Sequence, residues 1–573
     1  MNTLRDKAVR YLAKHVEEIT ARQNELGEFW PDPGRPAQWN TDYQQFAFYP
    51  LAWLYTLEHP DNPWRGSVKV LAAVERSFRN NLRILDAQGD FIATSHDQAP
   101  GPHANNWRTF FWFKAWECMR GKLDKDLDAR CEEGLRRAHQ SVVKSARHHA
   151  AEKGFAENHN VRNHPFWYFL CSFELAKYFK DAENEAWARE TYEKVCGVQH
   201  PAGVYYEHDG PVMVYAHVAL NALSHYHHLS GSAAARQCLD RALNFHRHFT
   251  YPDGTPIEIL DGRTRYTGYT MSILPAAWSA RPEGRAYLHF LMDKLLEQPL
   301  GGGWQVHGGW LGLGFFTQFA ADLPMDAAPV AGVAALPGEG QHEAASLPVR
   351  VIRRGPWTVA VSGFTRREMP WQRWCLDYQT HFTIHHQKAG LIVGGGGGKR
   401  QPHWSLFAGG SRPLSLPCLA TAGSVQTQGP FAVRLTLEYP GFEALLDVEV
   451  GVDDVRLCAQ VTRSKALEAP PEPVHLQLPF LMKGAGAVIT GTNTERELDA
   501  QDEIMPGELA GMIGRKGKWR IEGLEVARAL LLVLPYNTHW RNGWAHDEKA
   551  MGIVAQPLSY GAPRHLTVHG PEK

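Results

Sequence analysis

The chain has 573 residues, a formal net charge of −1 and 44% hydrophobic residues. This length exceeds what one hydrophobic core usually holds, so we expect at least two domains, and the composition excludes an intrinsically disordered chain. The balanced charge excludes a generally basic nucleic-acid binder. An acidic ligand remains possible, because the field in a cleft depends on the charges nearby.

No stretch of sequence approaches the roughly 18 apolar residues that a membrane-spanning helix needs. The N-terminus leads directly into an amphipathic pattern and shows no export signal. We therefore expect a soluble, cytoplasmic protein, or a periplasmic or secreted one if a leader has been removed. Eight cysteines are scattered without CxxC spacing, which argues against a thiolate zinc site and fits reduced thiols.

The first half of the chain repeats one arrangement, in which helical stretches of roughly 15 to 20 residues alternate with loops rich in Gly, Pro, His and aromatic residues. We expect about twelve helices in this half. The clearest are 4–22, 43–57, 67–81, 107–120, 127–148, 165–179, 185–196, 212–229 and 233–249. Consecutive helical hairpins with no strand pattern between them favour an α/α toroid over other helical bundles. The loops at one end of such a toroid line a cleft.

A segment rich in proline and small residues, 326–348, divides the chain into a helical domain, 1–325, and a second domain, 349–573. In the second domain the apolar residues follow a period of two, which predicts an antiparallel β-sandwich. The expected strands are 349–353, 357–362, 382–386, 391–393, 433–439, 445–450, 455–461, 474–478, 519–521 and 529–534.

Two predicted helix starts carry Asn among aromatic residues. Asn106 and Trp107 open one of them, although an Asn at a helix start is also an ordinary cap for a backbone N–H. Asn158-His159 and Asn163-His164 precede the other, where Pro165 marks the first turn. Capping explains one Asn but not two Asn-His pairs within seven residues, so a ligand site is an equal alternative.

Two further segments could carry chemistry. In the first, Tyr206 and His208 precede a helix that contains Tyr215. Tyr215 lies on an apolar stripe of this helix, so it also fits a core aromatic residue. In the second, Arg263 and Arg265 follow Gly262 and could hold a carboxylate, or could pair with Asp261. Trp167 and Trp310 are candidate platforms for stacking on sugar rings.

Together these segments resemble the α/α-toroid polysaccharide lyases, namely the heparinase II/III-like, alginate lyase and hyaluronate/chondroitin lyase families. Residues 163–168 match the Asn-His opening of an inner helix in those families. His208 followed by Tyr215 matches their His/Tyr pair in order and approximate spacing, and Arg263 resembles their Arg segment. The resemblance implies that Asn163 neutralises a uronate carboxylate, with Asn158 as the alternative for this role. It also implies that His208 and Tyr215 transfer protons and that Arg263 assists.

The resemblance also implies β-elimination from an anionic polysaccharide or oligosaccharide, leaving an unsaturated uronide, and we expect no cofactor. The expected substrate-binding residues are Asn106, Trp107, Asn158, His159, His164, Trp167, Tyr206, Arg265 and Trp310. The heparinase-like β-domain usually carries a His-x-His-x-x-Asp stretch, which this chain lacks. His381 and His385 share one face of a predicted strand and are weak candidates for a metal, without an evident third ligand.

Two other functions stay open at this point. An α/α barrel also hosts glycoside hydrolases with a carboxylate pair, which could be drawn from Glu207, Asp209, Asp253, Glu258 and Asp261. A non-catalytic glycan-binding protein would use the aromatic residues alone. We favour the lyase, because the Asn, His, Tyr and Arg segments occur in order.

Overall fold

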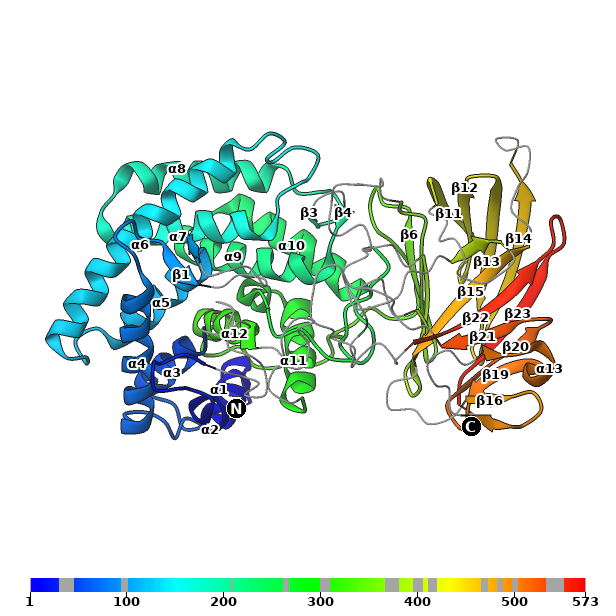
Figure 1. Ribbon diagram of the computed structural model, residues 1–573, viewed down its shortest axis with the longest axis horizontal. Coiled ribbons are helices and arrows are strands. Elements are labelled where there is room, and N and C mark those ends of the chain that lie inside the picture. The colour runs from blue at the N-terminus through cyan, green and yellow to red at the C-terminus, as the bar shows by residue number, and fades with distance from the viewer. Residues whose placement is uncertain are drawn as a thin grey trace. The chain divides into compact units, whose positions relative to one another are not determined.

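The computed structural model describes residues 2–29, 46–93, 101–207, 210–260, 266, 268–298, 310–365, 381–394, 406–410, 420–464, 473–481, 488–496, 503–531 and 551–571. The chain forms two compact units (Figure 1). The first comprises Met1–His208, Val214–Arg247 and Tyr269–Ala335. The second comprises Asp209–Met213, His248–Gly268 and Leu336–Lys573.

The prediction of a helical N-terminal half is confirmed, with twelve α-helices in its described residues. They are α1 (Leu4–Lys14), α2 (Val16–Ala21), α3 (Phe48–Thr56), α4 (Val68–Ile84), α5 (Asn106–Met119), α6 (Lys125–Ala151), α7 (Asn163–Phe179), α8 (Ala182–Gly197), α9 (Met213–Ser230), α10 (Ala233–His248), α11 (Pro282–Leu296) and α12 (Trp310–Asp322). The helix predicted at 4–22 is divided at His15, which ends α1 and precedes α2.

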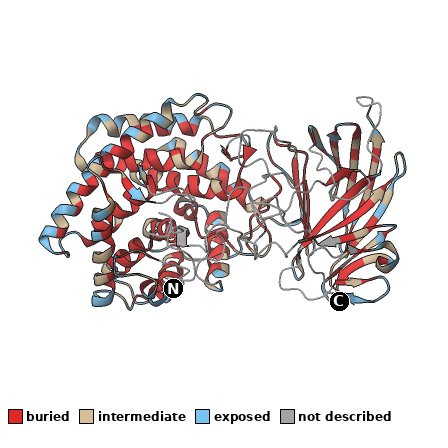
Figure 2. Cartoon of the chain, in the orientation of Figure 1, coloured by how far each residue is buried: buried red, intermediate tan, exposed pale blue. Residues whose placement is uncertain are grey.

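Inner and outer helices alternate, which is the arrangement of an α/α toroid. The inner helices are α3, α5, α7, α9 and α12, and buried side-chain hydrogen bonds link several of them. Trp167 of α7 donates its indole N–H to the carbonyl of Val218 in α9 at 2.9 Å, and Tyr49 of α3 donates to Gln318 of α12 at 3.1 Å. Figure 2 shows exposed positions gathered along outer helices such as α6 and α8.

Aromatic rings fill the middle of this helical ring. Phe111 of α5 has its ring centroid 5.0 Å from Phe46, 5.1 Å from Phe315 and 5.5 Å from Trp167. All four side chains are fully buried. The inner helices therefore bury aromatic side chains against one another, and burial of aromatic area supplies much of the stability of this unit.

A buried ionic network also joins the inner helices. The ring nitrogens of His225 lie 2.8 Å from Asp322 Oδ2 and 3.0 Å from Glu174 Oε2, and Glu174 Oε1 lies 2.8 Å from Lys114 Nζ. Burial alone lowers the pKa of His225, but Asp322 and Glu174 raise that pKa to about 9. His225 is therefore an imidazolium at neutral pH, paired on both sides as a buried charge must be.

A seven-residue turn recurs in the helical half, at 23–29, 85–91, 199–205 and 250–256. In every copy the N–H of the second residue donates to the carbonyl of the sixth, at 2.8–3.0 Å. The fifth residue is always a glycine, with φ between 85° and 92°. This region of φ is costly for residues with a Cβ, so the glycine fixes the turn.

The first and third copies of the turn share a clamp onto the next outer helix. The amide of Gln23 donates to the carbonyl of Ala73 at 2.8 Å and accepts from Arg76 at 2.8 and 3.1 Å. Gln199 makes the equivalent contacts with α10, accepting from Arg241 at 2.8 Å. The toroid is thus assembled from a repeated helix-turn unit.

The second half forms antiparallel sheets, as predicted, although their arrangement as a sandwich stays a prediction. The described strands make three large sheets. One contains β5 (Gly340–Glu343), β6 (Val349–Arg354), β7 (Trp357–Ser362), β8 (Phe382–His386) and β9 (Gly390–Val393). Another contains β10 (Phe407–Gly409), β15 (Val474–Leu481), β22 (Met551–Leu558), β21 (Arg528–Leu531) and β18 (Glu503–Ile504).

The third sheet is the largest. In order it contains β11 (Ala422–Gly429), β12 (Ala432–Tyr439), β13 (Phe442–Val450), β14 (Asp454–Arg463), β23 (Arg564–His569), β20 (Trp519–Leu524), β19 (Gly511–Arg515), β16 (Val488–Thr490) and β17 (Glu495–Arg496). One hydrophobic core includes side chains from all three sheets, for example Ile352, Leu476 and Leu446.

Candidate functional site

The N-terminal ends of α5 and α7 meet through Asn106. The cap of α5 is Asn105, whose side chain accepts from the N–H of Arg108 at 2.8 Å. This leaves the Asn106 amide to reach across, and its Nδ2 donates to the carbonyl of His164 at 2.9 Å. The capping role considered for Asn106 therefore belongs to its neighbour, and Asn106 ties two helix starts together.

An aromatic pair lies at the same junction. Trp107 of α5 and His164 of α7 stack with ring centroids 4.3 Å apart and an interplanar angle of 25°. Trp107 is buried, whereas His164 is half-buried. The pair brings two of the predicted substrate-binding side chains together.

Asn163 is held by a carboxylate that the sequence interpretation assigned to other roles. The short strand β3 (Tyr206–Glu207) carries Glu207 to the start of α7. Glu207 Oε2 accepts from the backbone N–H of Asn163 at 2.9 Å, and the side-chain Nδ2 of Asn163 lies 3.1 and 3.2 Å from Oε2 and Oε1. Both residues are buried, with Asn163 4% and Glu207 8% exposed.

This contact changes the expected cap of α7. The sequence placed Asn163 or His164 at the cap, but the cap position is occupied by Arg162, which makes no side-chain capping bond among the described residues. Glu207 satisfies the first N–H of the helix instead. A carboxylate suits this place, because the helix dipole is positive at the N-terminus.

Three rings pack beside β3. His159 and His200 approach with centroids 4.6 Å apart, and His200 stacks on Tyr206 at 5.4 Å. Burial, and to a lesser extent His159, lowers the pKa of His200 to about 4. His159 Nδ1 lies 2.9 Å from the carbonyl of Val198, so this predicted binding residue is fastened to the protein backbone.

The other predicted residues are placed differently. Trp167 is fully buried among Phe110, Phe111 and Phe315, so it belongs to the core and presents no face for a sugar. Asn158 is exposed in a left-handed turn, with φ of 48°, and takes no part in the Asn163–Glu207 contact.

Tyr215 is half-buried in the first turn of α9, and Tyr206 is half-buried in β3. His208, Arg263 and Arg265 lie outside the described residues, as does the side chain of Trp310. The structure thus brings together Asn106, Trp107, Asn163 and His164, and adds Glu207.

The two histidines considered for a metal have separate partners in the second unit. His381 Nδ1 lies 2.8 Å from the carbonyl of Ser362, and burial lowers the pKa of His381 to about 4. His385 Nε2 lies 3.3 Å from Asp253 Oδ2, and the hydroxyl of Tyr266 donates to the same carboxylate. Burial alone raises the pKa of Asp253, but His385 and Tyr266 bring it down to about 2.

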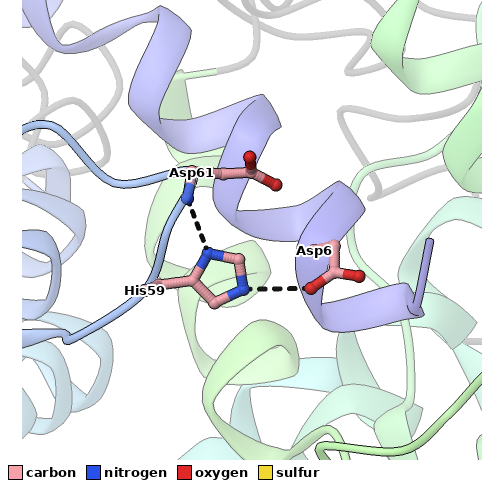
Figure 3. A group of neighbouring side chains, drawn as sticks. All are labelled: Asp6, His59 and Asp61. Atoms are coloured by element: carbon pink, nitrogen blue, oxygen red, sulfur yellow. Dashed lines mark hydrogen bonds and ion pairs between the residues drawn. The ribbon is translucent and has the colours of Figure 1, made fainter. Parts of the chain in front are cut away.

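Within the described residues, one group of three side chains has the composition of a metal site: Asp6, His59 and Asp61 (Figure 3). His59 lies between the two acids, with Nε2 3.0 Å from Asp6 Oδ1 and Nδ1 accepting from the Asp61 N–H at 3.1 Å. Asp61 is also paired with Arg10 at 2.9 Å. A cation would have to compete with these bonds, so we interpret the group as a set of hydrogen bonds and ion pairs that connects α1 to the loop after α3.

No described helix combines the length and the apolar character required to cross a membrane. This finding concerns only the part of the chain that the structure describes.

Comparison with known proteins finds similarity in structure alone. The sequence matches no model of a known protein family and no curated protein. Among solved structures, the chondroitin AC lyase of Streptomyces coelicolor A3, in complex with chondroitin sulphate, is similar over 99% of this chain and 80% of that chain, with a TM-score of 0.53 and 13% identity. This chain has the fold of the α/α-toroid polysaccharide lyases.

Two more similarities are weaker. A chondroitinase AC lyase is similar over 100% of this chain and 83% of that chain, with a TM-score of 0.49 and 13% identity. The unsaturated glucuronyl hydrolase of Bacillus sp. GL1 is similar over 56% of this chain and 96% of that chain, with a TM-score of 0.34 and 12% identity.

Proposed function

We propose that the protein is a polysaccharide lyase that cleaves a uronic-acid-containing glycan by β-elimination. The observation that carries this proposal is the polar cluster of Asn106, Asn163 and Glu207 beside the Trp107–His164 stack. Two helix N-termini meet there, one of them occupied by Glu207, and they bring polar and aromatic side chains of the kind that contact a glycan into one cluster. Chondroitin AC lyase, which shares the fold, binds an anionic polysaccharide, and this supports the same class of substrate here.

The chemistry requires that the charge of the uronate carboxylate be offset, because removal of the C5 proton adds charge to the same group. Arg263, together with the Asn106 amide, would stabilise that charge through preorganised donors. His208 or Tyr215 would take the C5 proton, and a tyrosine hydroxyl would protonate the departing O4. The product carries a conjugated double bond, and no water is consumed.

The test is a panel of alginate, glucuronan, pectate and glycosaminoglycans, followed by near-ultraviolet absorbance. We expect an absorbing product from at least one polymer. Tyr215→Phe should lower kcat by roughly 10²–10⁴-fold, the usual contribution of a general acid or base. The matched control is Tyr226→Phe on the same helix, where the ring is fully buried and stacked on Tyr192 at 4.0 Å.

Other outcomes would contradict the lyase. New reducing ends without ultraviolet absorbance would identify a glycoside hydrolase. Binding to a glycan without any cleavage would identify a glycan-binding protein, and Tyr215→Phe would then change affinity alone.

A further inference from the structure

The Asn163–Glu207 contact determines which side of the Asn163 amide remains for a ligand. An asparagine amide has one edge that donates and one oxygen that accepts. Here the donating nitrogen faces the Glu207 carboxylate, with both carboxylate oxygens within 3.2 Å of Nδ2. The reverse orientation would place the amide oxygen against an acceptor, so the chemistry fixes the assignment.

The amide oxygen of Asn163 is left over. Oδ1 is buried and has no hydrogen-bond partner in the described part of the chain. A buried acceptor without a partner destabilises the folded protein, so native proteins usually satisfy it with protein, water or ligand. The residue itself is 4% exposed, and the carbonyl of the next residue, His164, accepts from Asn106, so Asn163 lies at the helix junction where the proposed function expects the glycan.

Glu207 fixes the orientation of the Asn163 side-chain amide. Glu207 accepts the backbone N–H as well as the side-chain N–H of Asn163, so the carboxylate holds the residue at two points. The α7 cap, Arg162, pairs instead with Glu152, so the start of the helix relies on Glu207. The amide cannot rotate without placing an oxygen against this carboxylate.

We infer that Glu207 is a positioning residue that makes Asn163 a hydrogen-bond acceptor, so that the group Asn163 meets on the substrate is a sugar hydroxyl and not the ionised carboxylate. An ionised carboxylate has no proton to donate to Oδ1, whereas every hydroxyl of a glycan has one. This inference rests on the proposed glycan site. It moves the neutralisation of the uronate away from Asn163, the residue to which the resemblance assigns it.

The variant Glu207→Gln separates the two roles of Asn163. The glutamine has nearly the same shape, but its NH2 can donate to Oδ1, so the Asn163 amide can turn and present its own NH2 outwards. If Asn163 accepts from a hydroxyl, KM rises by roughly tenfold with little change in kcat, because one neutral hydrogen bond is lost from substrate and transition state alike. If Asn163 instead donates to a carboxylate, Glu207→Gln keeps or improves both constants, which would overturn the inference.

Two companion variants exclude a general loss of folding. Glu207→Asp keeps a carboxylate and should restore most of the affinity that Glu207→Gln loses. Glu157→Gln changes an exposed carboxylate in the loop before α7 and should leave KM unchanged. The double variant Asn163→Ala with Glu207→Gln should be no weaker than Asn163→Ala alone, because Glu207 acts through Asn163.

The inference can fail separately from the lyase activity. If no polymer is cleaved, the same variants are compared by tryptophan fluorescence with a glucuronan tetrasaccharide as the ligand, because Trp107 lies beside the site. A roughly tenfold weaker Kd for Glu207→Gln supports the inference in a non-lyase. An unchanged Kd, or no binding of the tetrasaccharide to the wild type, overturns it.

Discussion

The glycine of the repeated turn offers a direct test of how the toroid is assembled. In the third copy, Gly203 has φ of 92°, and a Cβ on this residue would lie 2.5 Å from the carbonyl oxygen of Arg241 on α10. Gly203→Ala therefore combines an unfavourable backbone conformation with a collision against another helix. The collision cannot be relieved by a side-chain rotation, because the atom that is struck belongs to the backbone.

The expected cost follows from these two terms. The positive φ costs about 1–2 kcal/mol for an alanine. Moving the turn away from α10 weakens the Gln199 clamp, whose bonds to Gly203, Cys238 and Arg241 measure 3.1, 3.0 and 2.8 Å. At about 1 kcal/mol each, their partial loss brings the decrease in the free energy of unfolding to about 3–4 kcal/mol.

The matched control is Gly121→Ala. Gly121 has φ of 75°, but a Cβ there would meet nothing within 4 Å. This variant bears the conformational cost alone, about 1–2 kcal/mol. The assay is urea unfolding followed by far-ultraviolet circular dichroism of the full chain. Equal destabilisation by the two variants would refute the reasoning, because it would show that docking of the turn on α10 contributes nothing.

Three further predictions concern buried side chains. The folded pKa of His225, about 9, lies above its unfolded value of about 6.5. The stability that the His225 charge contributes is therefore present below pH 6.5 and lost as pH rises through 9. The difference in unfolding free energy between wild type and His225→Gln should accordingly shrink by up to about 3 kcal/mol between these two pH values. Trp167→Phe should lower the free energy of unfolding by about 2–4 kcal/mol and leave KM for a cleaved glycan unchanged, because the side chain lies in the core. A raised KM would show that Trp167 contacts the substrate. The pKa of Asp253 is depressed to about 2, so its pairing with His385 stabilises the fold above pH 4 and is lost as pH falls through 2. Asp253→Asn should therefore be destabilised at pH 7 and converge with wild type in acid, as measured by thermal unfolding.

Much of the fold can be predicted from the sequence, because the hydrophobic period differs between its halves. The strands predicted at 357–362 and 382–386 coincide with β7 and β8. The strand β11 escapes prediction because it lies at the edge of the largest sheet, where most of its side chains are exposed and its apolar alternation is faint. The sequence gives no range for α11 or α12, and α12 illustrates the reason: its apolar residues lie on most of its circumference, so it shows little amphipathic period.

The repeated turn leaves only a weak signal in the sequence. Its copies share a glycine at the fifth position and a polar or aromatic residue at the second, but the positions between them vary too much to stand out without the backbone hydrogen bonds. Gln23 and Gln199 give the clearest signal, since each has an arginine further along the chain as its partner. The pairing becomes visible only when the next outer helix is in place.

The candidate site shows a different limit. Local sequence placed Asn163 at a helix start, and the structure agrees that the residue lies there. What the sequence could not show is that Glu207, 44 residues later, reaches the same N–H groups and uses them. A helix start that appears from its own residues to offer donors to a substrate carboxylate is already occupied by a carboxylate of the protein. The remaining atom of Asn163 is an acceptor, so any neutralisation of a uronate must come from other donors, and a substrate hydroxyl becomes the group that this asparagine recognises.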